Sequence, residues 1–280
     1  MVAGQSNKII AIIQARIQST RLPGKVLMPM PLTGKKSILE QIVTQLGKSK
    51  FQPRVVIATS ENNADDGIAS LCESKKIQVY RGDEEDVHSR FFEILKSSEY
   101  HTAIRVTGDN PIIDVDYLDV VLENHLETHS DYSYTTDLPI GMNFEVFNVK
   151  AFDRMSSLDL SKEDKEHVTL KFKSNNAFSK NLIKINSEFR QKLRLTIDYP
   201  SDYLLLSTLF DLSQLYGIEP GIKLINFILC KNPWLFQVNE GHFQKKQFNS
   251  LDEEIMYSIE LLNHLELNKS AQCLSNYAGV

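Results

Sequence analysis

The chain has 280 residues, of which 42% are hydrophobic and 24% charged, and its formal net charge is -5. This composition is typical of a globular protein, and the acidic charge argues against general nucleic-acid binding, which needs a basic face. Three widely spaced cysteines favour reduced thiols in a cytoplasmic protein over a disulfide framework or a zinc site. We expect no signal peptide, because residues 1–8 are short and polar, and no membrane span.

The first predicted element is a strand over residues 9–14, an isoleucine-rich run that indicates burial on both faces. It leads into a loop that contains Arg16, Arg21 and Lys25. The turn Pro23-Gly24 lets the backbone bend so that several donors face one point. A triphosphate would match these guanidinium and ammonium groups, and a basic surface loop is the alternative. The glycine-rich dinucleotide fingerprint and the P-loop are absent, so binding would depend on side chains.

Strands and helices then alternate with short connections. The predicted helices cover residues 37–46, 65–75 and 86–96, and the predicted strands cover residues 54–59, 77–80 and 102–106. This order indicates a mostly parallel sheet covered on both faces, in which ligands gather at the carboxyl ends of the strands. The segments expected at that edge are 14–25, 59–60, 81–82 and 107–111.

Two aspartates, Asp114 and Asp116, follow the 102–106 strand. Their spacing matches the two-carboxylate motif with which nucleotide-sugar glycosyltransferases hold a metal. Helical periodicity begins at Tyr117, however, so Asp114 is better interpreted as the N-cap of a helix.

The alternation breaks down in a central insert at about residues 131–192, where strands over 132–135 and 143–148 and a polar helix over 162–172 are predicted. Residues 193–198 then show the alternation of a strand that ends at Asp198, and Pro200 marks the start of a helix. Asp202 would favour the first turn of that helix through the helix dipole.

The end of the chain is helical. Residues 220–229 predict one helix, and residues 250–265 predict an amphipathic helix with an acidic first turn. We therefore expect a main domain over residues 1–242 that includes the insert, followed by a helical appendage over residues 243–280.

Three segments carry a resemblance to a known family: Ala15-Arg16 with residues 19–25, residues 105–111, and residues 193–204. Together they resemble the CTP-dependent cytidylyltransferases that activate ulosonic and sialic-type sugar acids. The chain is most similar to the spore-coat polysaccharide cytidylyltransferase-like branch, over roughly residues 8–242. The resemblance implies a three-layer Rossmann-like nucleotidyltransferase fold, similar to that of glycosyltransferase A, with a central insert for dimerisation and acceptor binding.

The resemblance also implies roles for individual residues. Asp109 and Asp198 would hold Mg²⁺, which would neutralise charge on the α-phosphate of CTP. Arg16 and Lys25 would contact the β- and γ-phosphates, with Arg21 nearby. Candidate nucleotide-binding residues, some of them chosen only for their place at the sheet edge, are Ala15, Arg16, Arg21, Lys25, Thr59, Ser60, Arg81, Thr107 and Gly108. Candidate acceptor-binding residues are Glu145, His167 and Arg194, although a structural histidine is as good a reading of His167.

The function expected from these features is Mg²⁺-dependent transfer of CMP from CTP to an anionic small-molecule acceptor by a homodimer in the cytoplasm, for surface polysaccharide or glycan synthesis. No residue stands out as a general base. Two alternatives stay open: a metal-dependent glycosyltransferase that uses Asp114 and Asp116, and a non-catalytic nucleotide-binding relative. The identity of the acceptor does not follow from the sequence.

Overall fold

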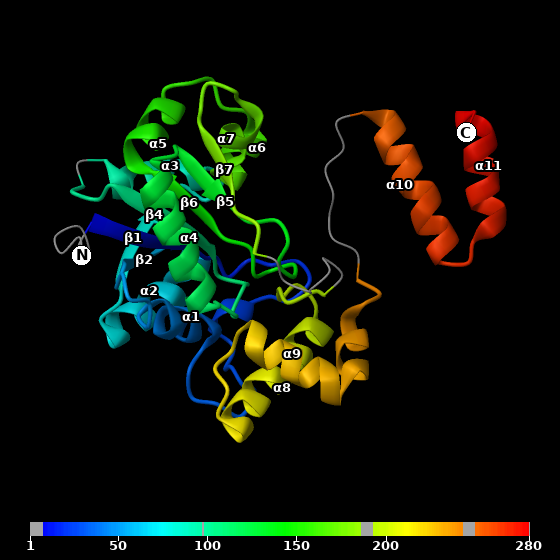
Figure 1. Ribbon diagram of the computed structural model, residues 1–280, viewed down its shortest axis with the longest axis horizontal. Coiled ribbons are helices and arrows are strands. Elements are labelled where there is room, and N and C mark those ends of the chain that lie inside the picture. The colour runs from blue at the N-terminus through cyan, green and yellow to red at the C-terminus, as the bar shows by residue number, and fades with distance from the viewer. Residues whose placement is uncertain (1–7, 97, 186–192, 243–249, 280) are drawn as a thin grey trace. The chain divides into compact units, whose positions relative to one another are not determined.

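The computed structural model describes residues 8–96, 98–185, 193–242 and 250–279 (Figure 1). The chain divides into two compact units, Met1–Glu240 and Gly241–Val280. Among the described residues, no helix is both long and apolar enough to cross a membrane.

A seven-stranded sheet forms the centre of the first unit, in the order β3-β2-β1-β4-β6-β5-β7. The strands are β1 (Ile9–Gln14), β2 (Arg54–Ser60), β3 (Gln78–Gly82), β4 (Thr102–Thr107), β5 (Tyr132–Tyr134), β6 (Glu145–Asn148) and β7 (Lys180–Leu182). All neighbouring pairs are parallel except the two that involve β6, which is antiparallel to both β4 and β5. This mostly parallel sheet, with helices on both faces, confirms the predicted α/β class.

Two hydrophobic cores cover the two faces of the sheet. Alternate residues of β1 divide between them, since Ala11 and Ile13 face one core and Ile10 and Ile12 face the other. The first core receives α1 (Ile38–Leu46), α2 (Asp66–Lys75), α4 (Val115–Thr128), α8 (Pro200–Tyr216) and α9 (Ile222–Lys231). The second receives α3 (Val87–Leu95), α5 (Val149–Ser156) and α7 (Leu170–Ser174). Burial on both faces explains the unbroken apolar run of β1.

Local capping explains where several helices begin. Ser37 and Glu40 form a reciprocal capping box at the start of α1. The Asp114 carboxylate accepts a hydrogen bond from the Tyr117 amide and caps α4, which confirms the predicted cap.

The insert departs from the prediction at one helix. The helix expected over 162–172 is divided into α6 (Lys162–His167) and α7, with Val168 between them at a φ of +60°. The amide of Thr169 donates to the carbonyl of His167 at 2.6 Å, which closes a γ-turn around Val168. A β-branched residue rarely adopts this conformation, so helical periodicity could not reveal the break.

The strand predicted over 193–198 is wrong. The segment is extended, but it makes only one isolated bridge, between Arg194 and Ile140, and belongs to no strand. Its backbone instead spans two neighbours, because Leu195 donates to the Ile140 carbonyl and Ile197 donates to the Asp109 carbonyl. A Cβ at Gly141 would lie 2.6 Å from the Leu195 carbonyl oxygen, so glycine permits this close approach.

The remaining elements of the described residues are 3-10 helices of the first unit and two helices of the second unit. The 3-10 helices are η2 (Lys25–Leu27), η3 (Asn63–Asp65) and η4 (Pro233–Asn239). The second unit contains α10 (Leu251–His264) and α11 (Asn268–Ala278), which contact each other. Residues 186–192 of the expected insert and 243–249 of the expected appendage lie outside the described residues, and the predicted domain boundaries stay predictions.

Candidate active site

The cationic loop begins where β1 ends and is fixed at both sides. The Ile17 amide donates to the buried Asp65 carboxylate at 2.6 Å, and Asp65 also accepts from the amide and hydroxyl of Ser60 at the end of β2. The Gly24 amide donates to the Ile17 carbonyl at 3.0 Å and closes the loop. Gly24 has a φ of +72°, a conformation that favours glycine, and it leads directly into η2.

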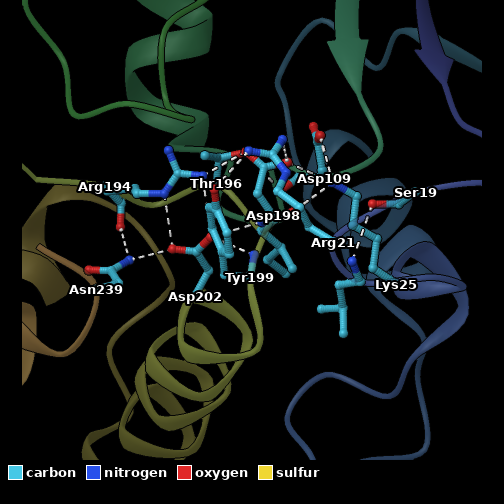
Figure 2. A network of polar contacts seen from close by, with 12 residues as sticks. Ser19, Arg21, Lys25, Asp109, Arg194, Thr196, Asp198, Tyr199, Asp202 and Asn239 are labelled. Carbon is cyan, nitrogen blue, oxygen red and sulfur yellow. Dashed lines mark hydrogen bonds and ion pairs between the residues drawn. The ribbon is translucent and has the colours of Figure 1, made fainter. Parts of the chain in front are cut away.

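Lys25 brings together the two aspartates that the sequence singled out (Figure 2). Its ammonium lies 3.1 Å from Asp109 Oδ2 and 3.1 Å from Asp198 Oδ1, and it donates to the Ile197 carbonyl at 2.5 Å. The Lys25 side chain is only 9% exposed. The hydrogen bond between the backbones of Ile197 and Asp109 holds the two carboxylate-bearing segments side by side. Residues 89 positions apart in the sequence therefore share one cation.

Asp198 is held from both sides by cations. Lys25 and Arg21 contact Oδ1, with the Arg21 Nη2 at 2.9 Å, and Arg194 Nη2 donates to Oδ2 at 2.6 Å. The Arg21 guanidinium also lies over the Tyr199 ring, 4.9 Å from its centroid. The orientation of the Asp198 carboxylate is thus fixed by three positive side chains.

Asp202 is the fully buried support of this arrangement. Its Oδ2 accepts from the Asp198 amide at 2.8 Å and from the Tyr199 amide at 2.9 Å. Its Oδ1 accepts from Arg194 Nε at 3.0 Å and from Asn239 Nδ2 at 2.7 Å. Figure 2 shows this carboxylate between Arg194, Asn239 and the first turn of α8. Asp202 therefore positions both the backbone of Asp198 and the arginine that contacts its side chain.

The electrostatics of the site favour ionised carboxylates. Burial by itself would raise the pKa of Asp198, but the positive charge of Lys25 and hydrogen bonds from Arg194 and Lys25 lower that pKa below its ordinary value. Burial opposes the charge of Arg194 as well, yet its bonds to Asp202 and Asp198 raise the pKa of the guanidinium. Asp198 consequently stays ionised at neutral pH.

A divalent cation fits this chemistry. Asp109 and Asp198 supply carboxylate oxygens that converge on one positive charge, and such oxygens are the ligands that Mg²⁺ prefers. The described residues contain no group of three or more acidic, histidine or cysteine side chains suited to a metal. Mg²⁺ is commonly held by one or two carboxylates together with substrate phosphates and water, so a pair is sufficient for such a site.

Other nucleotide-binding candidates lie around this centre in different ways. Arg16 is exposed, directly after the buried Ala15 at the loop start. Gly108 packs closely on this turn, because a Cβ there would lie 3.1 Å from the Ala15 Cβ. The buried Thr107 hydroxyl makes no hydrogen bond among the described residues. These four positions meet at the carboxyl ends of β1 and β4.

Two of the three candidates on β2 and β3, Ser60 and Arg81, have side-chain partners, whereas the buried Thr59 hydroxyl makes no hydrogen bond among the described residues. Thr59 and Ser60 are almost completely buried, and the Ser60 hydroxyl donates to Asp65. Arg81 donates to the carbonyls of Ser60 and Asn62, each at 2.9 Å, and pairs with Asp66 at 2.7 Å. Ser60 and Arg81 therefore hold the connection after β2 in this arrangement.

The acceptor candidates divide into two groups. Glu145 lies at the start of β6 and accepts from Arg105 at 2.5 Å, Lys173 at 2.7 Å and Thr169 at 3.0 Å. Burial would raise the pKa of Glu145, but the charges of Arg105 and Lys173 hold it well below its usual range. His167 is half-buried beside the Val168 turn. Arg194, by contrast, is 4% exposed and engaged with the aspartates described above.

Asp114 and Asp116, the alternative metal-binding pair, make contacts away from Lys25. Asp114 caps α4 through one oxygen and accepts from the Ile222 amide at 2.7 Å through the other. Asp116 forms an exposed pair with Lys223 at 2.8 Å. Neither aspartate is among the partners of Lys25, so the structure gives the glycosyltransferase alternative no support.

Sequence reasoning missed three residues that organise the site. Asp65 and Asn239 carried no motif, and Asp202 was interpreted only as a first-turn residue favoured by the helix dipole. Only the position of Asp202 four residues after Asp198 could have suggested a link, because Asp198 lies one residue before the N-cap of α8 and Asp202 lies in its first turn. The bond from Ile17 to Asp65 and the contacts of Asn239 join segments that are far apart in the sequence, so they leave no local signal.

The α/β sheet, the cationic loop after its first strand and the carboxylate pair beside that loop define a nucleotidyltransferase. Comparison with known proteins narrows this class, because residues 10–224 match the family described as Cytidylyltransferase. The chain belongs to this cytidylyltransferase family.

Two relatives and one more distant structure illustrate the match. The chain is 36% identical to the spore coat polysaccharide biosynthesis protein SpsF of Bacillus subtilis, over 81% of this chain and 96% of that protein. A cytidylyltransferase structure from Leptospira borgpetersenii superposes with a TM-score of 0.73 at 28% identity, covering 86% of this chain and 100% of the other. The structure of CMP:2-keto-3-deoxy-manno-octonic acid synthetase complexed with CTP shares the fold, with a TM-score of 0.56 at 13% identity over 75% of this chain.

Proposed function

We propose that this protein transfers CMP from CTP to an acidic sugar or a related anionic acceptor, in a Mg²⁺-dependent reaction that releases pyrophosphate. The observation that supports this proposal most directly is the meeting of Asp109 and Asp198 at Lys25, beside Arg21. The structurally similar synthetase that was solved with CTP supports the choice of nucleotide. The name of the B. subtilis relative supports a role in surface polysaccharide synthesis.

The cationic loop would bind the triphosphate. Arg16, Arg21 and Lys25 offer guanidinium and ammonium donors that match phosphate oxygens and favour the leaving pyrophosphate. Ala15 and Gly108 let the backbone approach the nucleotide closely, and Thr107 adds a hydroxyl without a protein partner among the described residues. Further residues, Thr59, Ser60 and Arg81, would shape the surrounding pocket.

Asp109 and Asp198 would hold the metal, with Asp202 and Arg194 fixing the orientation of Asp198. When bound, Mg²⁺ supplies Lewis-acid stabilisation of the charge on the α-phosphate. An acceptor oxygen attacks the α-phosphorus in line, a new P–O bond forms, and the bond to the bridging oxygen of the β-phosphate breaks. An acceptor that is already ionised would suit the site, because its oxygen could attack without a general base.

The acceptor would lie toward β6. Glu145 fixes Arg105 and Lys173 in a cluster with one more positive than negative charge, which favours an anionic ligand. His167 would contact the acceptor from the adjoining turn. Arg194, whose guanidinium contacts Asp198, would support that carboxylate rather than bind the acceptor. We further propose a cytoplasmic homodimer, which size-exclusion chromatography with light scattering would test.

The experiment that tests the function is pyrophosphate release from CTP with a panel of eight- and nine-carbon sugar acids and phosphonates. At least one acceptor should give CMP-linked product in an amount equal to the pyrophosphate released, and chelation of divalent cations should stop the reaction. Asp198→Asn should lower turnover on the order of 1,000-fold, because metal-ion stabilisation contributes several kcal/mol. Asp116→Asn is the matched control and should retain turnover. A loss confined to Asp116→Asn would support the glycosyltransferase alternative and contradict the proposal.

A further inference from the structure

The Lys25 ammonium occupies the position at which the two carboxylates meet. Asp109 Oδ2, Asp198 Oδ1 and the Ile197 carbonyl oxygen all lie within 3.1 Å of its nitrogen. These are one backbone and two carboxylate oxygens around a single positive charge, which is also the donor set of a small hard cation. Lys25 and a metal ion held by the same pair would therefore compete.

The second oxygen of Asp198 offers no alternative. Oδ1 contacts both Lys25 and Arg21, whereas Oδ2 accepts from Arg194, whose side chain is 4% exposed and tied to Asp202. If Arg194 moved away, the carboxylate of the completely buried Asp202 would lose its positively charged partner, which is costly. A cation that reaches Asp198 must thus displace Lys25 and Arg21 from Oδ1.

The two displaceable cations belong to the same loop, whereas Arg194 does not. Lys25 carries its ammonium on a flexible four-carbon stem, and Arg21 is 35% exposed, so both can reorient. A triphosphate offers them several anionic oxygens in exchange for the carboxylates. Binding of the phosphates would then free the carboxylate oxygens in the same step.

On the basis of the proposed function, we propose that Lys25, assisted by Arg21, occupies the carboxylate pair until a triphosphate draws it away, so that the divalent cation binds with or after the nucleotide. Lys25 thereby acts as a positioning residue that couples the two ligands. Because such coupling is reciprocal, each ligand raises the affinity for the other by the same factor.

The test is Mn²⁺ binding to the purified nucleotide-free protein, measured by electron paramagnetic resonance and by isothermal titration. Lys25→Met removes the charge at similar length, and we expect it to bind Mn²⁺ at least about tenfold more tightly than the wild type. Lys48→Met, which removes an equal charge from the exposed pair with Glu219, should leave the affinity unchanged. Adding Asp198→Asn to Lys25→Met should abolish the gain.

Thermal unfolding gives a second measurement that does not depend on activity. Lys25→Met leaves two carboxylates without their shared cation, so its melting temperature should fall and should recover with added Mn²⁺, while the wild type should respond weakly. Equal Mn²⁺ affinity in wild type and Lys25→Met would overturn the proposal. So would a gain that persists after Asp198→Asn.

Failure of this inference is distinguishable from failure of the proposed function. If CTP turnover requires Asp198 but Lys25→Met gains no affinity for Mn²⁺, only the exchange is wrong. If no acceptor supports pyrophosphate release from CTP, the proposed function fails whatever the Mn²⁺ titrations show.

Discussion

Replacement of Asp202 by asparagine tests the support of the candidate active site most directly. The change preserves the shape of the side chain but removes its charge and turns one acceptor oxygen into a donor NH₂ group. Oδ1 faces Arg194 and Asn239, and Oδ2 faces the amides of Asp198 and Tyr199. In either orientation, the new NH₂ group would therefore face at least two hydrogen-bond donors instead of the acceptor oxygen that they need.

The structure allows the size of the effect to be worked out. Asp202 is completely buried, and the substitution leaves the Arg194 guanidinium with one fewer counter-charge. Breaking a buried ion pair from one side typically costs about 3–5 kcal/mol, and we expect a loss of that size in the free energy of unfolding. Turnover should also fall on the order of 100-fold, because the backbone of Asp198 loses a fixed acceptor and its carboxylate shifts.

The assays are urea unfolding and CTP turnover at a temperature at which the variant is folded. Asp211→Asn, on the exposed side of the same helix, is the matched control and should change stability by less than about 0.5 kcal/mol. If Asp202→Asn were as stable as this control, or folded with full turnover, the assignment of Asp202 as the buried support of Asp198 would be refuted.

Three further predictions concern other parts of the chain. Burial lowers the pKa of His125 from 6.5 to about 4, so the free energy of unfolding, which has its full value above pH 6.5, should fall by roughly 1.4 kcal/mol at pH 5.5. In urea titrations His125→Gln should flatten this pH dependence, whereas the exposed His129→Asn should not. Ile12→Ala should cost about 2–5 kcal/mol through a cavity in the second core, measured in the same way, against less than about 0.5 kcal/mol for the exposed Leu215→Ala. A fragment of residues 1–242 should keep the circular dichroism signal of the α/β unit and its CTP turnover, because 86% of this chain matches the whole of the Leptospira structure. An insoluble or inactive fragment would contradict this prediction.

The sheet and its first helices could be predicted because their signals are local. The apolar run of residues 9–14 reports burial on both faces, and the Ser37 and Asp114 caps lie within three residues of the amides that they bind. The meeting of Asp109 with Asp198 depended on the family resemblance. Spacing alone cannot show that segments so far apart exchange a backbone hydrogen bond.

The segment around Arg194 shows why other details were beyond reach. The alternation of Leu195 and Ile197 with Arg194 and Thr196 suggested a strand, yet all four side chains are buried and no alternation of exposure accompanies the sequence pattern. A strand also needs a continuous partner, and here the neighbours are the single residues Ile140 and Asp109. The burial of Arg194 depends on two aspartates and the η4 asparagine, which only the folded chain assembles.

The reversed direction of β6 has a consequence for locating functional residues in folds of this kind. Parallel strands deliver their last residues to the ligand-facing edge, but a reversed strand delivers its first. Glu145 opens β6, and its register partner is Tyr134, the last residue of β5. A search confined to strand exits would pass over this glutamate, together with the segment 140–144 that enters the strand from the same edge.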